Sequence, residues 1–271
     1  MEGGGLLFAF SLTLLAGLST GLGSAIALFT KKTNKKFLSL SLGLSAGVMI
    51  YVSMIEIFFK AQESLTSELG TVLGSWVTII SFFGGMLFIA LIDKFIPGFE
   101  GTPEEKNSES ITVAEEVAED KSRLMRMGVF TALAVAIHNF PEGFATLISA
   151  LQDPTLGISI AIAIAIHNIP EGIAVSIPIY YATGDKLKAF KYSFLSGIAE
   201  PIGALVGYLI LAPFMSETIF GIIFAAVGGI MVFISLDQLL PAARDYGDHH
   251  LSVYGTVIGM IIMAISLVLL A

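Results

Sequence analysis

The sequence predicts an all-α membrane protein with eight transmembrane helices. Of its 271 residues, 55% are hydrophobic and only 13% are charged, and the mean hydropathy is +0.86. A soluble domain carries about 25% charged residues. The apolar residues run continuously over stretches of about 20 residues, the length that spans a bilayer as a helix. They do not alternate with polar residues as the strands of a transmembrane barrel do.

The spans can be placed in order along the chain. The first lies near the N-terminus, where no basic segment precedes it and the apolar run is longer than that of a signal peptide, so we expect it to be retained. The others follow at short intervals, except for one long loop at residues 97–122. The predicted spans are residues 6–29, 37–59, 71–95, 124–150, 156–181, 189–212, 217–240 and 251–270.

The basic residues predict the orientation. Thirteen of the 14 lysines and arginines follow the first, third, fifth and seventh spans, and only Lys60 follows the second. Because basic residues collect in cytoplasmic loops, both termini are predicted to lie outside the cytoplasm, in a cell (inner or plasma) membrane. Residues 1–271 then form a single transmembrane domain. Glycines spaced four apart, such as Gly43 and Gly47, predict close helix packing in lipid.

The loop at 97–122 is acidic and has few large apolar groups. Such composition is typical of a solvated linker, and a weak collecting site for cations is the alternative. The chain has no cysteine. This excludes disulfides, thiolate zinc sites and cysteine nucleophiles.

Two copies of one phrase stand out. They are His138–Gly143, HNFPEG, and His167–Gly172, HNIPEG; they differ at one residue and begin 29 positions apart. Both fall near the middle of a predicted span. There an ionisable side chain costs roughly 2.5–3.5 kcal/mol on insertion scales. Two such clusters at one depth indicate a functional site, and we interpret them as a transition-metal site on a transport path.

The spacing within each phrase suits metal binding. On a helix, His138 and Glu142 share a face and can chelate one ion, while Asn139 lies three residues from Glu142. Each glutamate can therefore join its histidine on one side and its asparagine on the other, which suits a carboxylate that bridges two cations. Imidazole favours Zn²⁺ and Fe²⁺, whereas carboxylate and amide oxygens suit harder ions. His167, Asn168 and Glu171 repeat the arrangement.

Each phrase also contains a proline, which interrupts the hydrogen bonding of its helix. Pro141 and Pro170 leave the carbonyls of Ile137 and Ile166 without their helical donors. Such freed carbonyls occur at membrane depth where they line a cavity or bind an ion. The two spans run in opposite directions, so a two-fold axis in the membrane plane would bring the phrases together, as in inverted-repeat transporters.

Other acidic residues are candidates of different kinds. Glu200, beside Pro201 in the sixth span, lies at the same depth as the phrases and is a predicted ligand. Glu56 is either an entrance or accessory ligand or a structural carboxylate. Asp237 near the inner end of the seventh span could form an exit relay with its neighbours, although an ordinary polar loop explains them equally well. Those neighbours are Asp245, Asp248, His249 and His250.

The paired HNxPEG phrases, the AEP of span six and the LDQLLP of span seven resemble the ZIP (Zrt/Irt-like) family of metal transporters over the whole chain. The resemblance implies a binuclear metal centre between spans four and five, uptake toward the cytoplasm, and a homodimer. It implies that His138, Glu142, His167 and Glu171 hold one ion. The second ion would be held, with Glu142 bridging, by Asn139, Asn168, Glu171 and Glu200.

We therefore predict a transporter that takes up Zn²⁺ and Fe²⁺ and is neither an enzyme nor a nucleic-acid-binding protein. The histidine at 167 resembles broad-range relatives, which extends the expected ions to Mn²⁺, Co²⁺ and Cd²⁺, while the acidic loop lacks the histidine run of many relatives. Two alternatives stay open. One is an intramembrane metal-dependent hydrolase, although the H-E-x-x-H pattern of a protease is not met. The other is a metal-gated channel or receptor.

Overall fold

The computed structural model describes residues 2–29, 35–95, 113–152, 154–211, 216–245 and 249–270. These segments are helical apart from residues 70, 184, 185 and 216, and they contain no strand. Three short stretches are π-helical: η1 (Val52–Ile57), η2 (Gly207–Leu211) and η4 (Ser235–Leu239). The α-helices are α1 (Glu2–Phe29), α2 (Lys35–Tyr51), α3 (Phe58–Leu69), α4 (Thr71–Phe95), α5 (Val113–Gln152), α6 (Pro154–Thr183), α7 (Lys186–Val206), α8 (Glu217–Ile234), α9 (Leu240–Asp245) and α10 (His249–Leu270).

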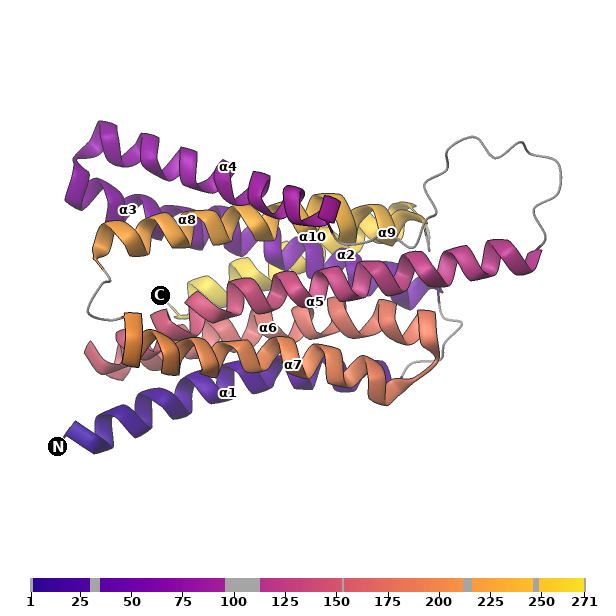
Figure 1. The fold of residues 1–271 in the computed structure, drawn as a ribbon, viewed down its shortest axis with the longest axis horizontal. Coiled ribbons are helices and arrows are strands. Elements are labelled where there is room, and N and C mark those ends of the chain that lie inside the picture. The colour runs from indigo at the N-terminus through magenta and orange to yellow at the C-terminus, as the bar shows by residue number, and fades with distance from the viewer. Residues whose placement is uncertain are drawn as a thin grey trace.

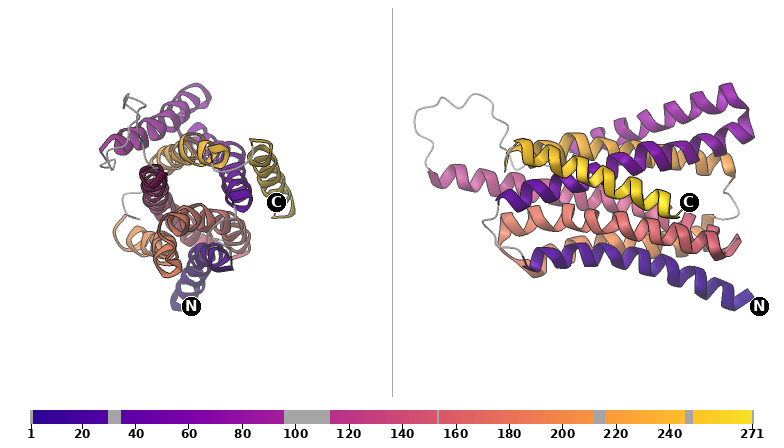
Figure 2. Two further views of the ribbon diagram at one scale, coloured as in Figure 1. Left: turned by 90° about the vertical axis from the view of Figure 1, so that its right-hand side faces the viewer. Right: turned by 180° about the vertical axis from the view of Figure 1, so that it is seen from behind.

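The helices run roughly parallel to one long axis and form two groups (Figure 1). Helices α1, α5, α6 and α7 pack against one another, and α2, α3, α4, α8 and α10 form a second group beside them. The groups meet where α2 contacts α6 and where α5 contacts α8. The view along the axis shows both groups (Figure 2, left). The large buried cluster, with Leu42, Phe130 and Met231 among its members, lies where the groups meet.

The helix pairs repeat in a way that confirms the predicted inverted repeat. Helix α1 packs on α6 as α7 packs on α5, and α10 packs on α2 as α4 packs on α8. Both ends of the chain lie at the same end of the bundle (Figure 1). Helix α5 ends at Gln152 and α6 begins at Pro154, and the two helices run antiparallel (Figure 1).

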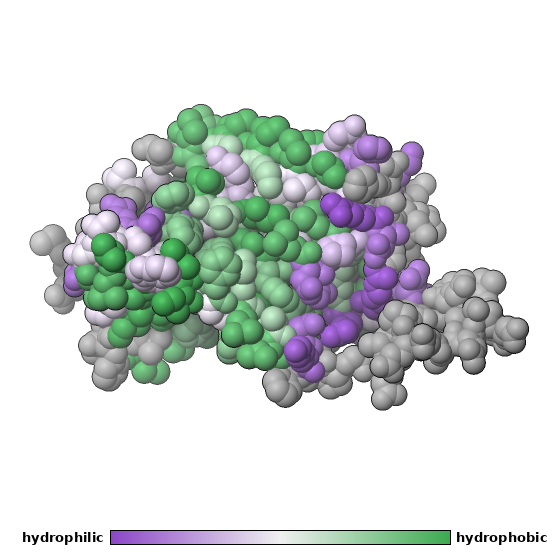
Figure 3. Space-filling model, turned by 90° about the horizontal axis from the view of Figure 1, so that it is seen from above, coloured by the Kyte–Doolittle hydropathy of each residue, from purple (hydrophilic) through white to green (hydrophobic). Residues whose placement is uncertain are grey.

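The surface has the distribution of a membrane protein. Large apolar side chains are exposed along the outer faces of α4 and α10, for example Trp76 at 60% and Ile265 at 54%. Hydrophobic residues cover most of the face seen in Figure 3, while hydrophilic residues gather toward the end where α9 lies. The chain is an integral, multi-pass membrane protein.

Seven of the described helical runs are long and apolar enough to cross a bilayer. The remaining predicted span, the fourth at residues 124–150, lies in α5 and packs against α6 and α7. It differs from the others because its copy of the phrase is flanked by smaller and more polar residues than the isoleucine-rich copy in α6. The eight predicted spans are thus all present as helices.

Three boundaries differ from the prediction. Residues 113–122, assigned to the acidic loop, form the first turns of α5, because alanine and glutamate there favour a helix. The remainder of that loop, residues 97–112, lies outside the described residues. The second span does not end at 59 but continues as α3 to Leu69, where Gly70 turns the chain with φ 78°, a conformation that glycine adopts without strain. The seventh span continues through α9 to Asp245.

Candidate metal site

The two phrases lie inside continuous helices, and Pro141 and Pro170 are interior helical residues. Their polar side chains are withdrawn from the surface: His138 and Glu171 are 0% exposed and His167 is 3% exposed. The carbonyl of Pro170 accepts a hydrogen bond from Ser45 Oγ of α2 at 2.7 Å. That contact fixes the phrase of α6 against the second helix group.

Histidine and glutamate pair across the two helices and not along them. Nε2 of His138 donates to Oε1 of Glu171 at 3.0 Å, and Nε2 of His167 donates to Oε2 of Glu142 at 3.4 Å. The predicted meeting of the two phrases is therefore confirmed. That each histidine chelates an ion together with the glutamate four residues on stays a prediction. The hydrogen bonds themselves are crossed between the copies, because the antiparallel helices bring opposite ends of the phrases together.

The asparagines hold the neighbouring helices. Asn168 Nδ2 donates to the carbonyl of Ala16 in α1 at 2.9 Å and to Glu200 Oε2 in α7 at 2.8 Å. Asn139 Nδ2 donates to the carbonyl of Ser196 in α7 at 3.3 Å. Glu200 is 0% exposed, so the structure brings this residue of the sixth span into contact with the phrase of α6, as its depth predicted.

Several buried oxygens of the site have no hydrogen-bond partner among the described residues. They are Oδ1 of Asn139, Oδ1 of Asn168, Oε2 of Glu171 and Oε1 of Glu200. Buried polar atoms are usually satisfied, so four unpartnered acceptors in contacting residues are exceptional. An acceptor-only set of this kind is suited to a cation, since a cation needs lone pairs and no donor.

The site is not a preassembled polyhedron. Within the described segments, no group of three or more histidine or acidic side chains is gathered tightly enough to enclose an ion. The histidines and glutamates form hydrogen-bonded pairs instead. The ligand atoms of a tetrahedral Zn²⁺ lie about 3.4 Å apart, since Zn–N and Zn–O bonds are about 2.0–2.2 Å. The paired atoms, 3.0 and 3.4 Å apart, are thus already near the separation of neighbouring ligands.

The two acidic residues predicted at either side of the site lie in π-helical segments. Glu56 is in η1 and forms an ion pair with Lys60 one turn later. Its side chain is 32% exposed. The structure thus gives Glu56 a basic partner. Both predicted roles for Glu56, an entrance or accessory ligand and a structural carboxylate, stay predictions.

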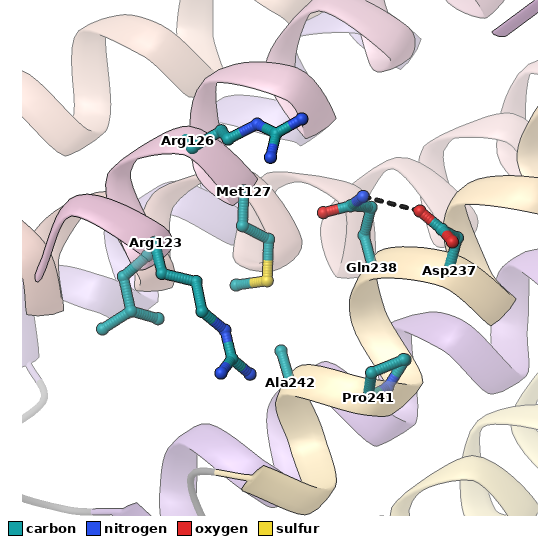
Figure 4. Close-up of a pocket in the computed structure, with 8 residues that line it drawn as sticks. Arg123, Arg126, Met127, Asp237, Gln238, Pro241 and Ala242 are labelled. Carbon is teal, nitrogen blue, oxygen red and sulfur yellow. Dashed lines mark hydrogen bonds between the residues drawn. The ribbon is translucent and has the colours of Figure 1, made fainter. Parts of the chain in front are cut away.

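Asp237, in η4, lines a pocket of about 220 Å³ at the basic end of the bundle (Figure 4). Gln238 Nε2 donates to its Oδ2 at 2.7 Å, and Arg123 and Arg126 of α5 face it across the pocket. Arg126 pairs with Asp93 of α4 at 3.2 Å, and Arg123 pairs with Asp245. The arginines were not foreseen as neighbours of Asp237, because nothing in the sequence places α5 beside η4.

The proposed exit relay is only partly visible. Asp245 lies beside the pocket but is engaged with Arg123. His250 stacks near Tyr254, with ring centroids 6.3 Å apart, and Asp248 and the side chain of His249 lie outside the described residues. A second hollow, apolar and about 450 Å³, lies between α4, α5 and α8 and is lined in part by Pro141 and Val227.

Comparison with known proteins shows which family the chain belongs to. The family model described as "ZIP Zinc transporter" matches residues 5–267. The chain belongs to the ZIP family. It is 65% identical over 266 residues to "Zinc transporter ZupT" of Oceanobacillus iheyensis, covering 98% of this chain and 99% of the relative. It is 66% identical over 268 residues to the protein of that name from Lysinibacillus sphaericus, with the same coverage.

A third relative, "Zinc transporter ZupT" of Clostridium perfringens, is 59% identical over 283 residues and is matched over 99% of both chains. ZIP members are transporters and not enzymes, so this chain is a metal-ion transporter of that family. The alternative of an intramembrane hydrolase receives no support from these relatives.

Proposed function

We propose that this protein takes up divalent transition-metal cations, with zinc foremost, through a binuclear site between α5 and α6. The observation that carries the proposal is the convergence of the two phrases: His138 with Glu171 and His167 with Glu142, all buried. Next to these pairs lie oxygens without hydrogen-bond partners in the described part of the chain.

Two cations fit the charge of the site. Glu142, Glu171 and Glu200 carry up to three negative charges in a region withdrawn from water, where unpaired anions are strongly disfavoured. Two divalent ions would leave a net charge of +1. One ion would take the imidazoles with the glutamates, and the other the asparagine oxygens with Glu200 and the glutamates.

The direction of transport and the range of ions extend this proposal. The ion enters from the side of the termini, loses its water at the midplane, and leaves at the basic end beside Asp237 (Figure 4). Mixed imidazole and carboxylate ligands accept Zn²⁺, Fe²⁺, Mn²⁺, Co²⁺ and Cd²⁺. The homodimer is proposed on the resemblance alone, and the mass of the protein in detergent would test it.

Uptake into sealed vesicles tests the function. The purified protein should accumulate Zn²⁺ and Fe²⁺, and a variant with both Glu142→Gln and Glu171→Gln should not. Glu68→Gln, the same chemical change at an exposed residue of α3, should transport as the unaltered protein does. Full uptake by the double variant would contradict the proposed site. Lipid or peptide hydrolysis without uptake would favour the hydrolase, and uncoupled or absent flux would favour a channel or receptor.

A further inference from the structure

The contacts of α1 with α6 recur almost residue for residue between α7 and α5. Asn168 Nδ2 donates to the carbonyl of Ala16 at 2.9 Å, and Asn139 Nδ2 donates to the carbonyl of Ser196 at 3.3 Å. Asn139 is 29 positions before Asn168, and Ser196 is 180 positions after Ala16. The same two shifts relate the close contact of Gly23 with Ile169 to that of Gly203 with Phe140.

Glycine contacts give the same correspondence. A Cβ at Gly172 would overlap the carbonyl oxygen of Thr20, and a Cβ at Gly143 would overlap that of Glu200. Gly143 is again 29 positions before Gly172, and Glu200 is 180 positions after Thr20. Gly17 and its own counterpart, 180 positions later, face each other: a Cβ on Gly17 would lie 2.7 Å from the carbonyl oxygen of Gly197. The two-fold axis therefore passes between these two glycines.

This axis makes Thr20 of α1 the counterpart of Glu200. Glu200 belongs to the metal site, where its Oε2 accepts from Asn168 and its Oε1 has no partner among the described residues. By the same rotation, the side chain of Thr20 extends toward Asn139. Threonine is shorter than glutamate, and the structure shows no hydrogen bond between Thr20 and Asn139.

The hydroxyl of Thr20 differs from the other buried hydroxyls of α1 in its hydrogen bonding. Buried hydroxyls in α1 normally donate to a carbonyl of the preceding turn: Thr13 to Ala9 at 3.1 Å, and Ser24 to Gly21 at 2.8 Å. Such local bonds are the usual way for a helix to satisfy serine and threonine. Thr20 is 0% exposed, yet its Oγ1 has no hydrogen-bond partner in the described segments.

We propose that Thr20 is a further residue of the cation site, whose hydroxyl oxygen joins Asn139 in holding the ion that the asparagine oxygens bind. This inference rests on the proposed function and deepens it. The site then has a charged side, formed by Glu200 and Asn168, and a neutral side, formed by Thr20 and Asn139. The neutral side supplies only hydroxyl and amide oxygens, which favour Mn²⁺ relative to Zn²⁺.

Equilibrium binding to the purified full-length protein tests this assignment, measured by calorimetry with Mn²⁺ and with Zn²⁺. Thr20→Val keeps the shape and removes the hydroxyl. It should weaken Mn²⁺ binding about three- to tenfold, the usual effect of losing one neutral ligand contact, and should weaken Zn²⁺ binding less. Thr20→Ser should restore binding. Thr13→Val, at a buried threonine on the same helix that bonds locally, should bind both ions unchanged.

A second substitution, Thr20→Glu, makes the two sides alike. It should tighten binding of both ions and lower the maximal rate of vesicle uptake, because the ion leaves a fourth carboxylate more slowly. Unchanged binding by both Thr20→Val and Thr20→Glu would overturn the role of Thr20. Equal loss in Thr20→Val and Thr20→Ser would do so as well, since only shape would then matter. In both cases metal uptake by the unaltered protein would leave the proposed function standing, whereas absence of that uptake would overturn both.

Discussion

Nε2 of His138 and Oε1 of Glu171 lie 3.0 Å apart, although they belong to different helices and to different copies of the phrase. His167 and Glu142 form the reciprocal pair. Each copy thus supplies the partner that the other lacks. A single copy would leave a histidine and a glutamate buried without partners, which explains why the phrase is present twice in one chain.

The crossed pairs should be detectable in the metal-free protein. His138→Ala removes the donor to Glu171 and leaves that buried carboxylate unpaired, which should lower the free energy of unfolding by about 3 kcal/mol. Adding Glu171→Ala should cost less than in the unaltered background, whereas adding Glu142→Ala should be closer to additive. The measurement is unfolding in detergent with a chelator present. Stronger coupling of His138 to Glu142 than to Glu171 would contradict the observed pairing.

Gly143 should not tolerate a methyl group. A Cβ there would overlap the carbonyl oxygen of Glu200, so α5 and α7 must separate. Overpacking of this kind costs about 1–3 kcal/mol, and it should also displace Glu200 and abolish most metal binding. Gly84→Ala is the matched control, because a Cβ at Gly84 has no neighbour within 4 Å and alanine favours a helix by about 0.5–1 kcal/mol. Thermal unfolding and metal titration of both variants check this prediction.

Ser45 connects the two helix groups at the depth of the site through its hydrogen bond to the carbonyl of Pro170. Ser45→Ala should reduce stability by about 0.6–1.7 kcal/mol, the range for hydrogen bonds between membrane helices. Ser11→Ala, where the hydroxyl bonds only within α1 and is exposed, should change stability by less. Equal losses in the two variants would show that the bond to Pro170 contributes nothing.

Asp237 is expected to act after the midplane site. Asp237 lies in the pocket at the basic end, and no residue of the phrases lines that pocket. Asp237→Asn should therefore leave the binding affinity for Zn²⁺ unchanged and lower the maximal uptake rate severalfold. Calorimetry and vesicle uptake separate the two effects. A weakened affinity with an unchanged maximal rate would instead place Asp237 in the binding site.

Much of the site followed from the sequence because short-range helical spacing and membrane depth determine it. His138, Glu142, His167 and Glu171 had to lie on facing helices at one depth, and the structure confirms that they meet. The crossed pairing could not be read from spacing, since it depends on how two antiparallel helices are rotated about their axes. The helical beginning of α5 was missed because an acidic composition suits both a linker and a solvated helix.

Contacts between elements that are distant in the chain were the least predictable. Ser45 and Arg126 each bond a residue more than 30 positions away, and neither belongs to a recognisable motif. Nothing in the sequence marked Thr20 as a residue of the site, because the hydroxyl of a threonine in an apolar span ordinarily donates to a carbonyl of its own helix. The correspondence between α1 and α7 distinguishes it, together with its buried hydroxyl that has no hydrogen-bond partner among the described residues.

The two-fold correspondence also constrains changes in chain length. The shift of 180 positions between α1 and α7 holds from Ala16 to Gly23, so a deletion or insertion inside either helix would rotate the later residues by about 100° and separate one asparagine from its carbonyl. Between α2 and α8 the shift is 182 positions, the separation of Gly47 and Gly229. These two glycines correspond because each lies against a carbonyl oxygen of the helix packed on its own: that of Thr256 for Gly47 and that of Phe82 for Gly229. The connections have thus gained or lost residues while the helix cores have kept their register. Tags and fusion partners should accordingly be placed in the connections, where this protein already differs between its two halves.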